Sequence, residues 1–247
     1  MIRPPVLEWQ VGVVTRIVTE NERTKSFTVS LQKWIAHRPG QHYDVRLTAP
    51  DGYQTERSYS AASEPERLGE IDLTVERIDD GEVSPYLHDV LVVGDRLELR
   101  GPIGGYFVWD VSLGGPLLLV GGGSGVVPLM AMLRHRAAQK SALPARLLYS
   151  CRSIDDVIYR EELDVLAHTG NALEVVFTFT RRAPAGWSGY QRRIDPAMLN
   201  DVKNPLGEEV RAYVCGPTLL VEAVSNELLA AGLPAERILT ERFGPTG

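Results

Sequence analysis

The strongest local signal in the second half of the chain is LLLVGGGSGVVP, residues 117–128. Its apolar start predicts a buried strand at Leu117–Val120, and the residues after the glycines predict a helix at Val126–Gln139 with Pro128 in its first turn. Glycines at such a junction let the backbone approach a pyrophosphate, and the helix N-terminus offers unpaired N–H groups. The segment Gly123–Gly125 therefore indicates a dinucleotide-binding turn, although a purely structural tight turn could have the same residues.

The rest of the second half alternates between predicted strands and helices. Such alternation predicts a parallel sheet covered by helices on both faces, so residues 114–247 are predicted to form a Rossmann-like α/β domain. Further strands are predicted at Arg146–Ser150, Leu173–Thr178 and Val210–Cys215, and further helices at Tyr159–His168, Pro196–Leu199 and Thr218–Ala231.

The first half consists of short β segments separated by turn signals such as Arg38-Pro39-Gly40. Strands are predicted at Val11–Thr19, Ser26–Leu31, His42–Thr48, Arg57–Ser60, Glu70–Arg77 and Arg96–Leu99. Short strands at near-regular spacing predict an antiparallel six-stranded β-barrel over residues 1–113, with a short helix near Ser84–Val90.

Composition excludes several classes of protein. The 247 residues contain two cysteines, Cys151 and Cys215, which excludes a disulfide framework, a four-cysteine zinc site and a self-contained four-thiolate iron–sulfur cluster. The histidines show no metal-ligand spacing, so no metal site is predicted. Lone thiols, and an N-terminus without the apolar core of a signal peptide, predict a cytoplasmic protein.

Charge and hydropathy argue against nucleic acids and membranes as partners. Residues 1–115 carry 12 Lys and Arg against 18 Asp and Glu, and the remaining residues carry 14 of each. A nucleic-acid-binding protein would show a basic stripe, which this sequence lacks. Residues 111–133 are 23 uncharged positions, but glycines at 121–125 interrupt them, so a buried strand, turn and helix are predicted instead of membrane insertion.

Arginines near the ends of two predicted strands bear on the type of nicotinamide cofactor. The second strand of the α/β domain is predicted to end without an acidic residue and is followed by Arg152, and Arg181 follows the third. An acidic residue there would bind the ribose 2′-hydroxyl of NAD, whereas the planar arginine fork suits the 2′-phosphate of NADP. The sequence therefore favours NADP, with solvated surface arginines as the alternative.

The segment Arg57-Ser58-Tyr59-Ser60 offers a second group of binding residues. Arg57 and Tyr59 share one strand face, and a hydroxyl follows on the other face. Such a set could neutralise a phosphate, stack on a planar ring and hydrogen-bond a ring nitrogen, although an ordinary surface strand is the alternative.

Several motifs follow one another along almost the whole chain, from about Leu7 to the C-terminus. They are R-S-Y-S at 57–60, a strand ending at Arg77, G-E-V-S-P-Y-L-H at 81–88, G-P-I-G at 101–104, the glycine turn at 121–128, C-G-P at 215–217 and E-R-F at 241–243. Their order and spacing resemble those of the ferredoxin–NADP reductase family. The resemblance implies FAD on the barrel and NADP(H) on the α/β domain.

The resemblance also implies roles for residues of the barrel. Arg57 would bind the flavin pyrophosphate, Tyr59 would stack on the isoalloxazine ring, and Ser60 would hydrogen-bond its N5. The further flavin-binding residues would be Ser58, Thr74, Val75, Arg77, Gly81, Val83 and Ser84, the last three around the pyrophosphate.

In the α/β domain, the resemblance implies that Cys215 lies beside C4 of the nicotinamide, in a turn that Gly216 and Pro217 complete. Gly123, Ser124 and Gly125 would bind the nucleotide pyrophosphate, Arg152 and Arg181 its 2′-phosphate, and Glu241 and Phe243 would lie near the flavin ring. Ser60, Cys215 and Glu241 would be the catalytic residues. Without the C-G-P motif, Cys215 would be taken for an inert buried thiol, which is the prediction for Cys151.

Three features depart from the family pattern. The chain continues past Phe243 with Gly-Pro-Thr-Gly, where plant-type members end in an aromatic residue that covers the flavin. Ser124 stands where threonine is common. The chain has no C-x4-C-x2-C run of a fused iron–sulfur domain, so an iron–sulfur partner is expected to be another protein.

The sequence and the resemblance together predict a flavin-dependent reductase. It would move hydride from NADPH to FAD and release electrons singly to a separate carrier such as ferredoxin or flavodoxin, although the acidic first half disfavours a strongly acidic carrier. The alternatives are a flavin-binding electron-transfer subunit of a larger complex and an NADH-dependent reductase component of an oxygenase system. A dehydrogenase without flavin would leave the barrel without a role.

Overall fold

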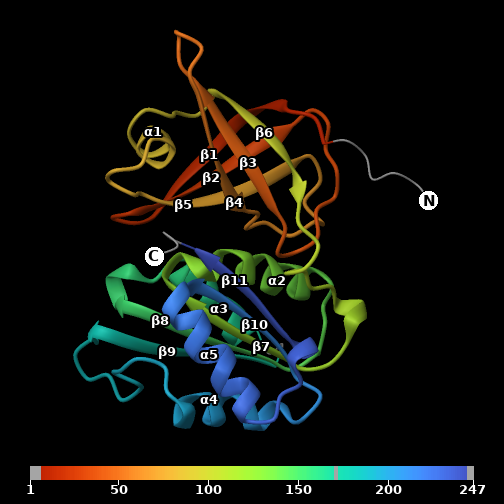
Figure 1. The fold of residues 1–247 in the computed structure, drawn as a ribbon, viewed down its shortest axis with the longest axis vertical. Coiled ribbons are helices and arrows are strands. Elements are labelled where there is room, and N and C mark those ends of the chain that lie inside the picture. Colours follow the sequence, from red (N-terminus) through yellow and green to blue (C-terminus); the bar gives the residue numbers. More distant parts are fainter. Residues whose placement is uncertain (1–6, 170–171, 244–247) are drawn as a thin grey trace.

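The computed structural model describes residues 7–169 and 172–243, which form two lobes along the long axis of the molecule (Figure 1). The amino-terminal lobe is an antiparallel sheet closed into a barrel, and the carboxyl-terminal lobe is a parallel sheet between helices. The prediction of a β-barrel followed by a Rossmann-like α/β fold is confirmed.

The barrel has six strands in the order β4-β3-β6-β1-β2-β5, and every neighbouring pair is antiparallel. Its elements are β1 (Gln10–Asn21), β2 (Thr24–Leu31), β3 (His42–Thr48), β4 (Gln54–Ser60), β5 (Glu70–Glu76), α1 (Val83–Asp89) and β6 (Arg96–Ile103). The barrel closes just beyond β4, where Ala61 forms a bridge with Leu73 of β5 and the Ala62 amide donates to the Asp72 carbonyl at 2.8 Å.

Apolar side chains fill the interior of the barrel, because successive residues of a strand point to opposite faces. Val14, Val29 and Val45 are fully buried there. Leu87 of α1 packs into the same core, so α1 is held against the barrel beside β4 and β5.

The second lobe contains five parallel strands in the order β11-β10-β7-β8-β9. They are β7 (Leu117–Gly122), β8 (Ala145–Ser153), β9 (Leu173–Arg182), β10 (Arg211–Pro217) and β11 (Ile238–Phe243). Every residue of the central strand β7 is buried, as its apolar run predicts. Strand β11 was not predicted, because it is a partly buried edge strand whose sequence ILTERF has no continuous apolar run.

Helices cover both faces of this sheet (Figure 1). α2 (Val126–Ala138) and α3 (Arg160–His168) lie on the face toward the barrel, and α4 (Pro196–Lys203) and α5 (Thr218–Ala230) lie on the opposite face. Short 3₁₀ turns occur at Val111–Leu113, Gly123–Gly125, Ile154–Asp156, Asn204–Leu206 and Ala235–Arg237. Within the described residues, no helix is both long and apolar enough to cross a membrane.

The two lobes share a packed interface. Phe107 and Trp109, which follow β6, belong to the apolar core between the parallel sheet and α2. The Arg134 guanidinium of α2 donates to the Ala62 carbonyl at 2.8 Å. The predicted division into domains 1–113 and 114–247 stays a prediction.

Candidate functional site

Two turns lie side by side at the carboxyl edge of the parallel sheet. β7 and β10 are neighbours, yet β8 lies on the outer side of β7 and β11 on the outer side of β10. At such a switch point the connections leave in opposite directions and open a crevice, in which α/β proteins bind ligands. The Gly123–Gly125 turn follows β7 and the segment Cys215–Pro217 ends β10, so both predicted nucleotide-binding segments lie at this crevice.

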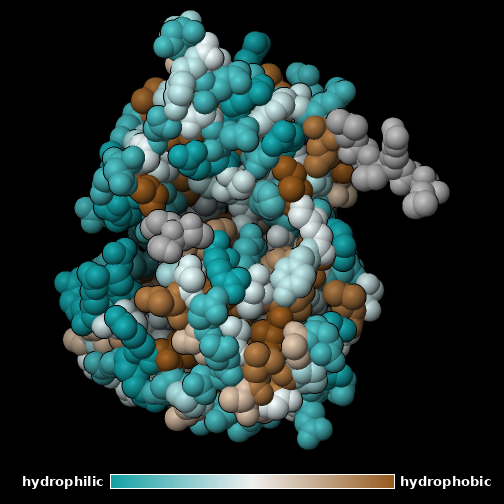
Figure 2. Space-filling model, viewed as in Figure 1, coloured by the Kyte–Doolittle hydropathy of each residue, from teal (hydrophilic) through white to brown (hydrophobic). Residues whose placement is uncertain are grey.

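The same edge of the sheet faces the barrel. The Gly123–Gly125 turn contacts β5 of the barrel as well as β10 and β11 of the sheet. Figure 2 shows a hollow between the two lobes on the left of the view, the side on which β8 and β9 end in Figure 1. The turn therefore brings a barrel strand and the carboxyl edge of the sheet together at one place.

Glycines allow the two turns to pack backbone against backbone. A Cβ at Gly125 would lie 2.2 Å from the carbonyl oxygen of Cys215, and a Cβ at Gly216 would lie 3.1 Å from the Gly122 nitrogen. Gly123 has a φ of 55°, and no described residue has an atom within 4 Å of the place of its Cβ. The glycine at 125 is thus explained by packing alone, whereas Gly123 leaves the backbone open toward the crevice. Ser124 between them is half-buried.

Cys215 and Glu241 are register partners on the parallel strands β10 and β11. The Cys215 side chain is fully buried, and burial, together with the nearby Glu241 carboxyl, raises the pKa of its thiol well above the usual range. Burial also raises the pKa of Glu241 to about 7. Its Oε2 atom is buried and has no hydrogen-bond partner among the described residues. The pair is therefore a protonated thiol beside a carboxyl group that titrates near neutral pH.

Two positions further along these strands, Pro217 is the register partner of Phe243. Pro217 is exposed, and Phe243 is partly buried against the apolar core between the sheet and α2. Both predicted residues therefore lie at the carboxyl edge next to Cys215 and Glu241.

The end of β4 carries the predicted flavin-binding residues of the first half. The Ser60 hydroxyl is buried and has no hydrogen-bond partner within the described part of the chain. Tyr59 is half-buried, and burial raises the pKa of its hydroxyl to about 12. Arg57 is exposed, and its guanidinium donates to the Glu56 carbonyl at 2.7 Å. The Ser58 hydroxyl instead donates to the Asp44 carboxylate at 2.7 Å.

The predicted residues of β5 differ in what their side chains contact. Thr74 is buried, with its hydroxyl 2.7 Å from the Ser26 hydroxyl. Val75 lies in the barrel core. Arg77 forms ion pairs with Asp79 and Asp89, so its guanidinium is already occupied by carboxylates.

The segment that leads into α1 is tied to the end of β5. The Ile78 amide donates to the Ser84 hydroxyl at 3.0 Å, and the Gly81 amide donates to the Ile78 carbonyl at 3.0 Å. Val83 is buried in the barrel core. These contacts hold Gly81, Val83 and Ser84 together beside β4 and β5. Their common role in flavin binding stays a prediction.

The arginines predicted to bind a 2′-phosphate lie near the ends of β8 and β9. Arg152 is 3.5 Å from Asp156 and 3.9 Å from Glu76 of β5, whereas Arg181 is exposed. β8 extends to Ser153, three residues beyond its predicted end, so that Asp155 and Asp156 follow it closely. The prediction that no acidic residue lies at the end of this strand was therefore wrong, because it placed the end of the strand too early.

Two family models match the two lobes. Residues 12–108 match the oxidoreductase FAD-binding domain, and residues 119–226 match the oxidoreductase NAD-binding domain. Over 237 residues the chain is 32% identical to ferredoxin–NADP reductase B of Sorangium cellulosum, which covers 94% of this chain and 95% of that one. The chain belongs to the ferredoxin–NADP reductase family. It is an oxidoreductase of the FAD- and NAD-binding class, as its motifs predicted.

The chain is also similar to proteins with other names. It is 32% identical over 215 residues to the toluate 1,2-dioxygenase electron transfer component of Pseudomonas putida, over 85% of this chain, and spans 59% of that relative's length. The flavohem-like FAD/NAD-binding domain of nitric oxide dioxygenase from Vibrio cholerae has a TM-score of 0.84 at 25% identity, covering 95% of this chain and 98% of that one.

The residues at the site fit a bound flavin. Ser60 Oγ and Glu241 Oε2 are buried polar atoms without partners among the described residues, and burying such atoms costs free energy unless a ligand or water pairs with them. A ring with a hydrogen-bonding edge would supply those partners, and the half-buried Tyr59 offers an aromatic face.

The sequence did not single out two tyrosines near the site. The Tyr149 hydroxyl of β8 donates to the Gly123 carbonyl at 3.0 Å, and Tyr159, before α3, donates to the Thr74 hydroxyl of β5. Neither residue lies in one of the motifs that carry the family resemblance. The sequence offered one signal for Tyr149: a tyrosine within an apolar strand is expected to be buried, and its hydroxyl then needs a hydrogen-bond partner.

Proposed function

We propose that this reductase takes hydride from NADPH onto FAD and passes electrons one at a time to a separate protein carrier such as ferredoxin or flavodoxin. One observation carries the proposal: the Gly123–Gly125 turn contacts β5 of the barrel and the β10 and β11 strands that hold Cys215 and Glu241. A nucleotide on this turn and a flavin on β5 would thus be adjacent.

The barrel residues would bind and orient the flavin. Arg57 has an exposed guanidinium that can bind the pyrophosphate. Gly81, Val83 and Ser84, at the start of the helix beside β4, would bind the same group. Tyr59 would stack on the ring, and the unpartnered Ser60 hydroxyl would hydrogen-bond its N5. Thr74, Val75 and Arg77 would line it from β5, and Ser58 would contribute its backbone, since its hydroxyl is engaged by Asp44.

The residues at the sheet edge would position the nicotinamide and hold a proton. FAD, when bound, supplies the ring that accepts hydride and releases electrons singly. The Gly123–Gly125 backbone and Gly216 and Pro217 would bind the nucleotide, with Phe243 beside them. Cys215, as a neutral and buried thiol, would lie next to the site of the nicotinamide C4. Glu241, with a pKa near 7, could hold or release a proton at its buried Oε2.

The preference for NADPH would depend on Arg152 and Arg181, because a guanidinium pairs well with a 2′-phosphate. A second candidate function is that of an NADH-dependent reductase component of an oxygenase system. Asp155 and Asp156 after β8 favour it, since a carboxylate at this place can bind a ribose 2′-hydroxyl. A relative named as a dioxygenase electron transfer component favours it as well.

Flavin reconstitution tests the binding half of the proposal. The purified protein should take up FAD and become yellow, and Tyr59→Ala should weaken FAD retention because it removes the stacking ring. Tyr106→Ala is the matched control, since Tyr106 is an exposed tyrosine of the barrel lobe that has no role in the proposal. A wild-type protein that binds no flavin would contradict the proposal, and equal retention by the two variants would reject the role of Tyr59.

A carrier assay tests the other half. FAD-loaded protein with NADPH or NADH should reduce a one-electron carrier protein, and a screen of ferredoxins, flavodoxins and oxygenase iron–sulfur proteins would identify the class of partner. If no carrier protein is reduced at any concentration of NADPH or NADH, electron transfer to a separate carrier is contradicted.

A further inference from the structure

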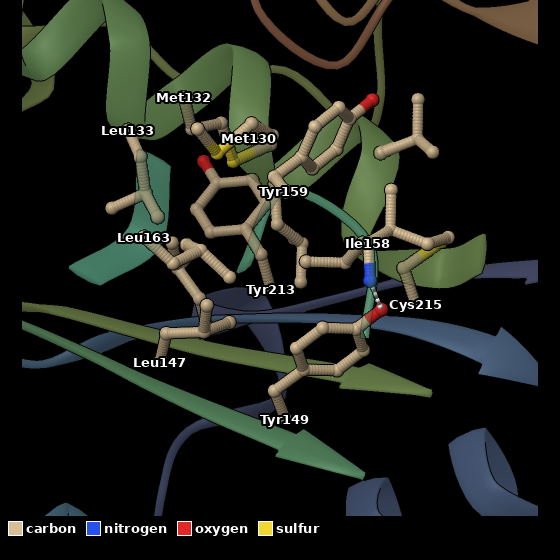
Figure 3. Close-up of a cluster of buried hydrophobic side chains, with 14 of the residues drawn as sticks. Met130, Met132, Leu133, Leu147, Tyr149, Ile158, Tyr159, Leu163, Tyr213 and Cys215 are labelled. Carbon is tan, nitrogen blue, oxygen red and sulfur yellow. Dashed lines mark hydrogen bonds between the residues drawn. The ribbon is translucent and has the colours of Figure 1, made fainter. Parts of the chain in front are cut away.

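A chain of contacts, made of hydrogen bonds and the peptide bond between Ile158 and Tyr159, links the Gly123–Gly125 turn to β5 of the barrel. The Tyr149 hydroxyl donates to the Gly123 carbonyl at 3.0 Å and accepts the Ile158 amide at 3.3 Å. Figure 3 shows the Tyr149 side chain rising from the sheet with its hydroxyl directed at Ile158. One end of this chain is therefore the turn that would bind the nicotinamide nucleotide.

The other end of this series of contacts is in the barrel. Tyr159, next to Ile158, lies on the side of it away from the strands (Figure 3). It is buried, and its hydroxyl donates to the Thr74 hydroxyl of β5. Thr74 in turn lies 2.7 Å from the Ser26 hydroxyl of β2. Two successive residues thus join the two lobes at the place where their ligands would meet.

The backbone and ring of Tyr159 are held from several sides. Its φ of 59° is in the left-handed region, which a tyrosine adopts only where the surrounding structure enforces it. Its amide donates to the Glu20 carboxylate at 3.3 Å, and the other oxygen of Glu20 accepts the Ser26 hydroxyl at 2.6 Å. The Arg134 guanidinium lies 4.9 Å from the centre of the Tyr159 ring.

Arg134 extends this set of contacts to β4. Its guanidinium forms a bidentate pair with Glu162 at 2.8 and 2.6 Å and donates to the Ala62 carbonyl, two residues after Ser60. The ring of Tyr159 is thus fixed against β5 directly and, through Arg134, against the segment that follows β4. β4 and β5 are the strands on which most of the predicted flavin-binding residues of the barrel lie.

From these contacts we infer that Tyr149 and Tyr159 form an interlobe strut that sets the position of the nucleotide-binding turn relative to the flavin strand. They are positioning residues for hydride transfer. The inference rests on the proposed function, because it concerns how the two ligands of that function are aligned. Alignment matters because displacing reacting atoms by about 1 Å can slow a reaction by about a hundredfold.

Tyr159→Phe tests the strut because it keeps the ring and removes only the hydroxyl. The matched control is Tyr213→Phe, which also removes a buried tyrosine hydroxyl that bonds across the interface, to the Val108 carbonyl at 2.8 Å, but lies outside the strut. If Tyr159→Phe does not fold, Tyr149→Phe interrupts the same chain from the other end.

Backbone hydrogen exchange of the flavin-free proteins gives a readout independent of activity. Removing the hydroxyl should raise amide exchange in residues 121–127 and 71–77, and the control should leave both segments as in the wild type. Exchange that is unchanged in both segments, or raised equally by the control, would overturn the inference.

Anaerobic single-turnover kinetics give the second readout. With FAD bound, the strut variant should reduce its flavin about fivefold to tenfold more slowly, while the Kd for the nucleotide stays within about twofold. A parallel loss of affinity and rate, or equal rates in variant and wild type, would contradict a positioning role. If neither NADPH nor NADH reduces the flavin of the wild-type protein, the proposed function is contradicted. The hydrogen-exchange result would then still show whether the strut exists.

Discussion

The carbonyl oxygen of Cys215 occupies the space in which a side chain of Gly125 would begin. A Cβ at Gly125 would lie 2.2 Å from that oxygen and 2.7 Å from Cα of Gly216. The φ of Gly125 is −61°, an ordinary value that any residue adopts. Close approach of the two turns, and not backbone conformation, therefore requires glycine at this position.

Gly125→Ala should force the two turns apart. The free energy of unfolding should fall by ~2 kcal/mol, as for other substitutions that overpack a close contact, and nucleotide affinity should fall with it. Gly105→Ala is the control, because in the part of the chain that the structure describes no atom lies within 4 Å of its Cβ position. Denaturant unfolding and nucleotide titration of both variants check the prediction. Equal stability and affinity of the two would show that the turns can separate freely.

Glu241 should make the stability of the flavin-free protein depend on pH. Its pKa is about 7 when folded and near 4.5 otherwise, so between these values the folded chain holds a proton that the unfolded chain has lost. Stability should therefore fall as pH rises through this window and level off above about 7. Glu241→Gln stays neutral, so its stability relative to the wild type should increase with pH across the window. A difference that is constant with pH, measured by urea unfolding, would contradict the raised pKa.

Both cysteines should be unreactive in the folded protein. Cys151 and Cys215 are buried, and burial raises the pKa of Cys151 to about 12 and that of Cys215 well above the usual range. Because the thiolate is the reactive form, an aromatic disulfide reagent at neutral pH should modify both thiols only after unfolding. Cys151→Ala leaves Cys215 as the sole thiol of the chain. Rapid modification of this folded variant would show that Cys215 is an exposed thiolate.

Arg181→Ala should reduce the preference for NADPH over NADH. Loss of one hydrogen bond to a charged phosphate, worth ~1.5 kcal/mol, predicts a fall of about tenfold in the ratio of kcat/KM values. Arg237→Ala is the control, because Arg237 pairs with Glu209 at the opposite, amino end of β11. An unchanged ratio would remove Arg181 from the specificity site, and a wild-type preference for NADH would favour a role for Asp155 or Asp156.

The general fold could be predicted from the sequence because its signals are local. The apolar run before the glycines gave the central strand β7, and the short strands of the first half gave the barrel. Strand β11 was not predicted because an edge strand buries only part of its surface. Its sequence ILTERF has neither a continuous apolar run nor a clear alternation of apolar and polar residues.

The arrangement of the site depends on contacts between distant residues. The Cys215–Glu241 register and the Tyr159–Thr74 hydrogen bond join residues 26 and 85 positions apart, and no short motif encodes either one. The family resemblance supplied Cys215 and Glu241 as candidates. It could not supply Tyr149 or Tyr159, because their hydrogen bonds to the Gly123–Gly125 turn and to β5 depend on the tertiary fold.

Anaerobic titration of the FAD-loaded protein with NADPH determines whether hydride passes from the nucleotide to the flavin. If a nucleotide on the Gly123–Gly125 turn lies against a flavin on β5, about one equivalent of NADPH should bleach the visible flavin absorption. A flavin that is bound but stays oxidised with excess NADPH and with excess NADH would contradict the account.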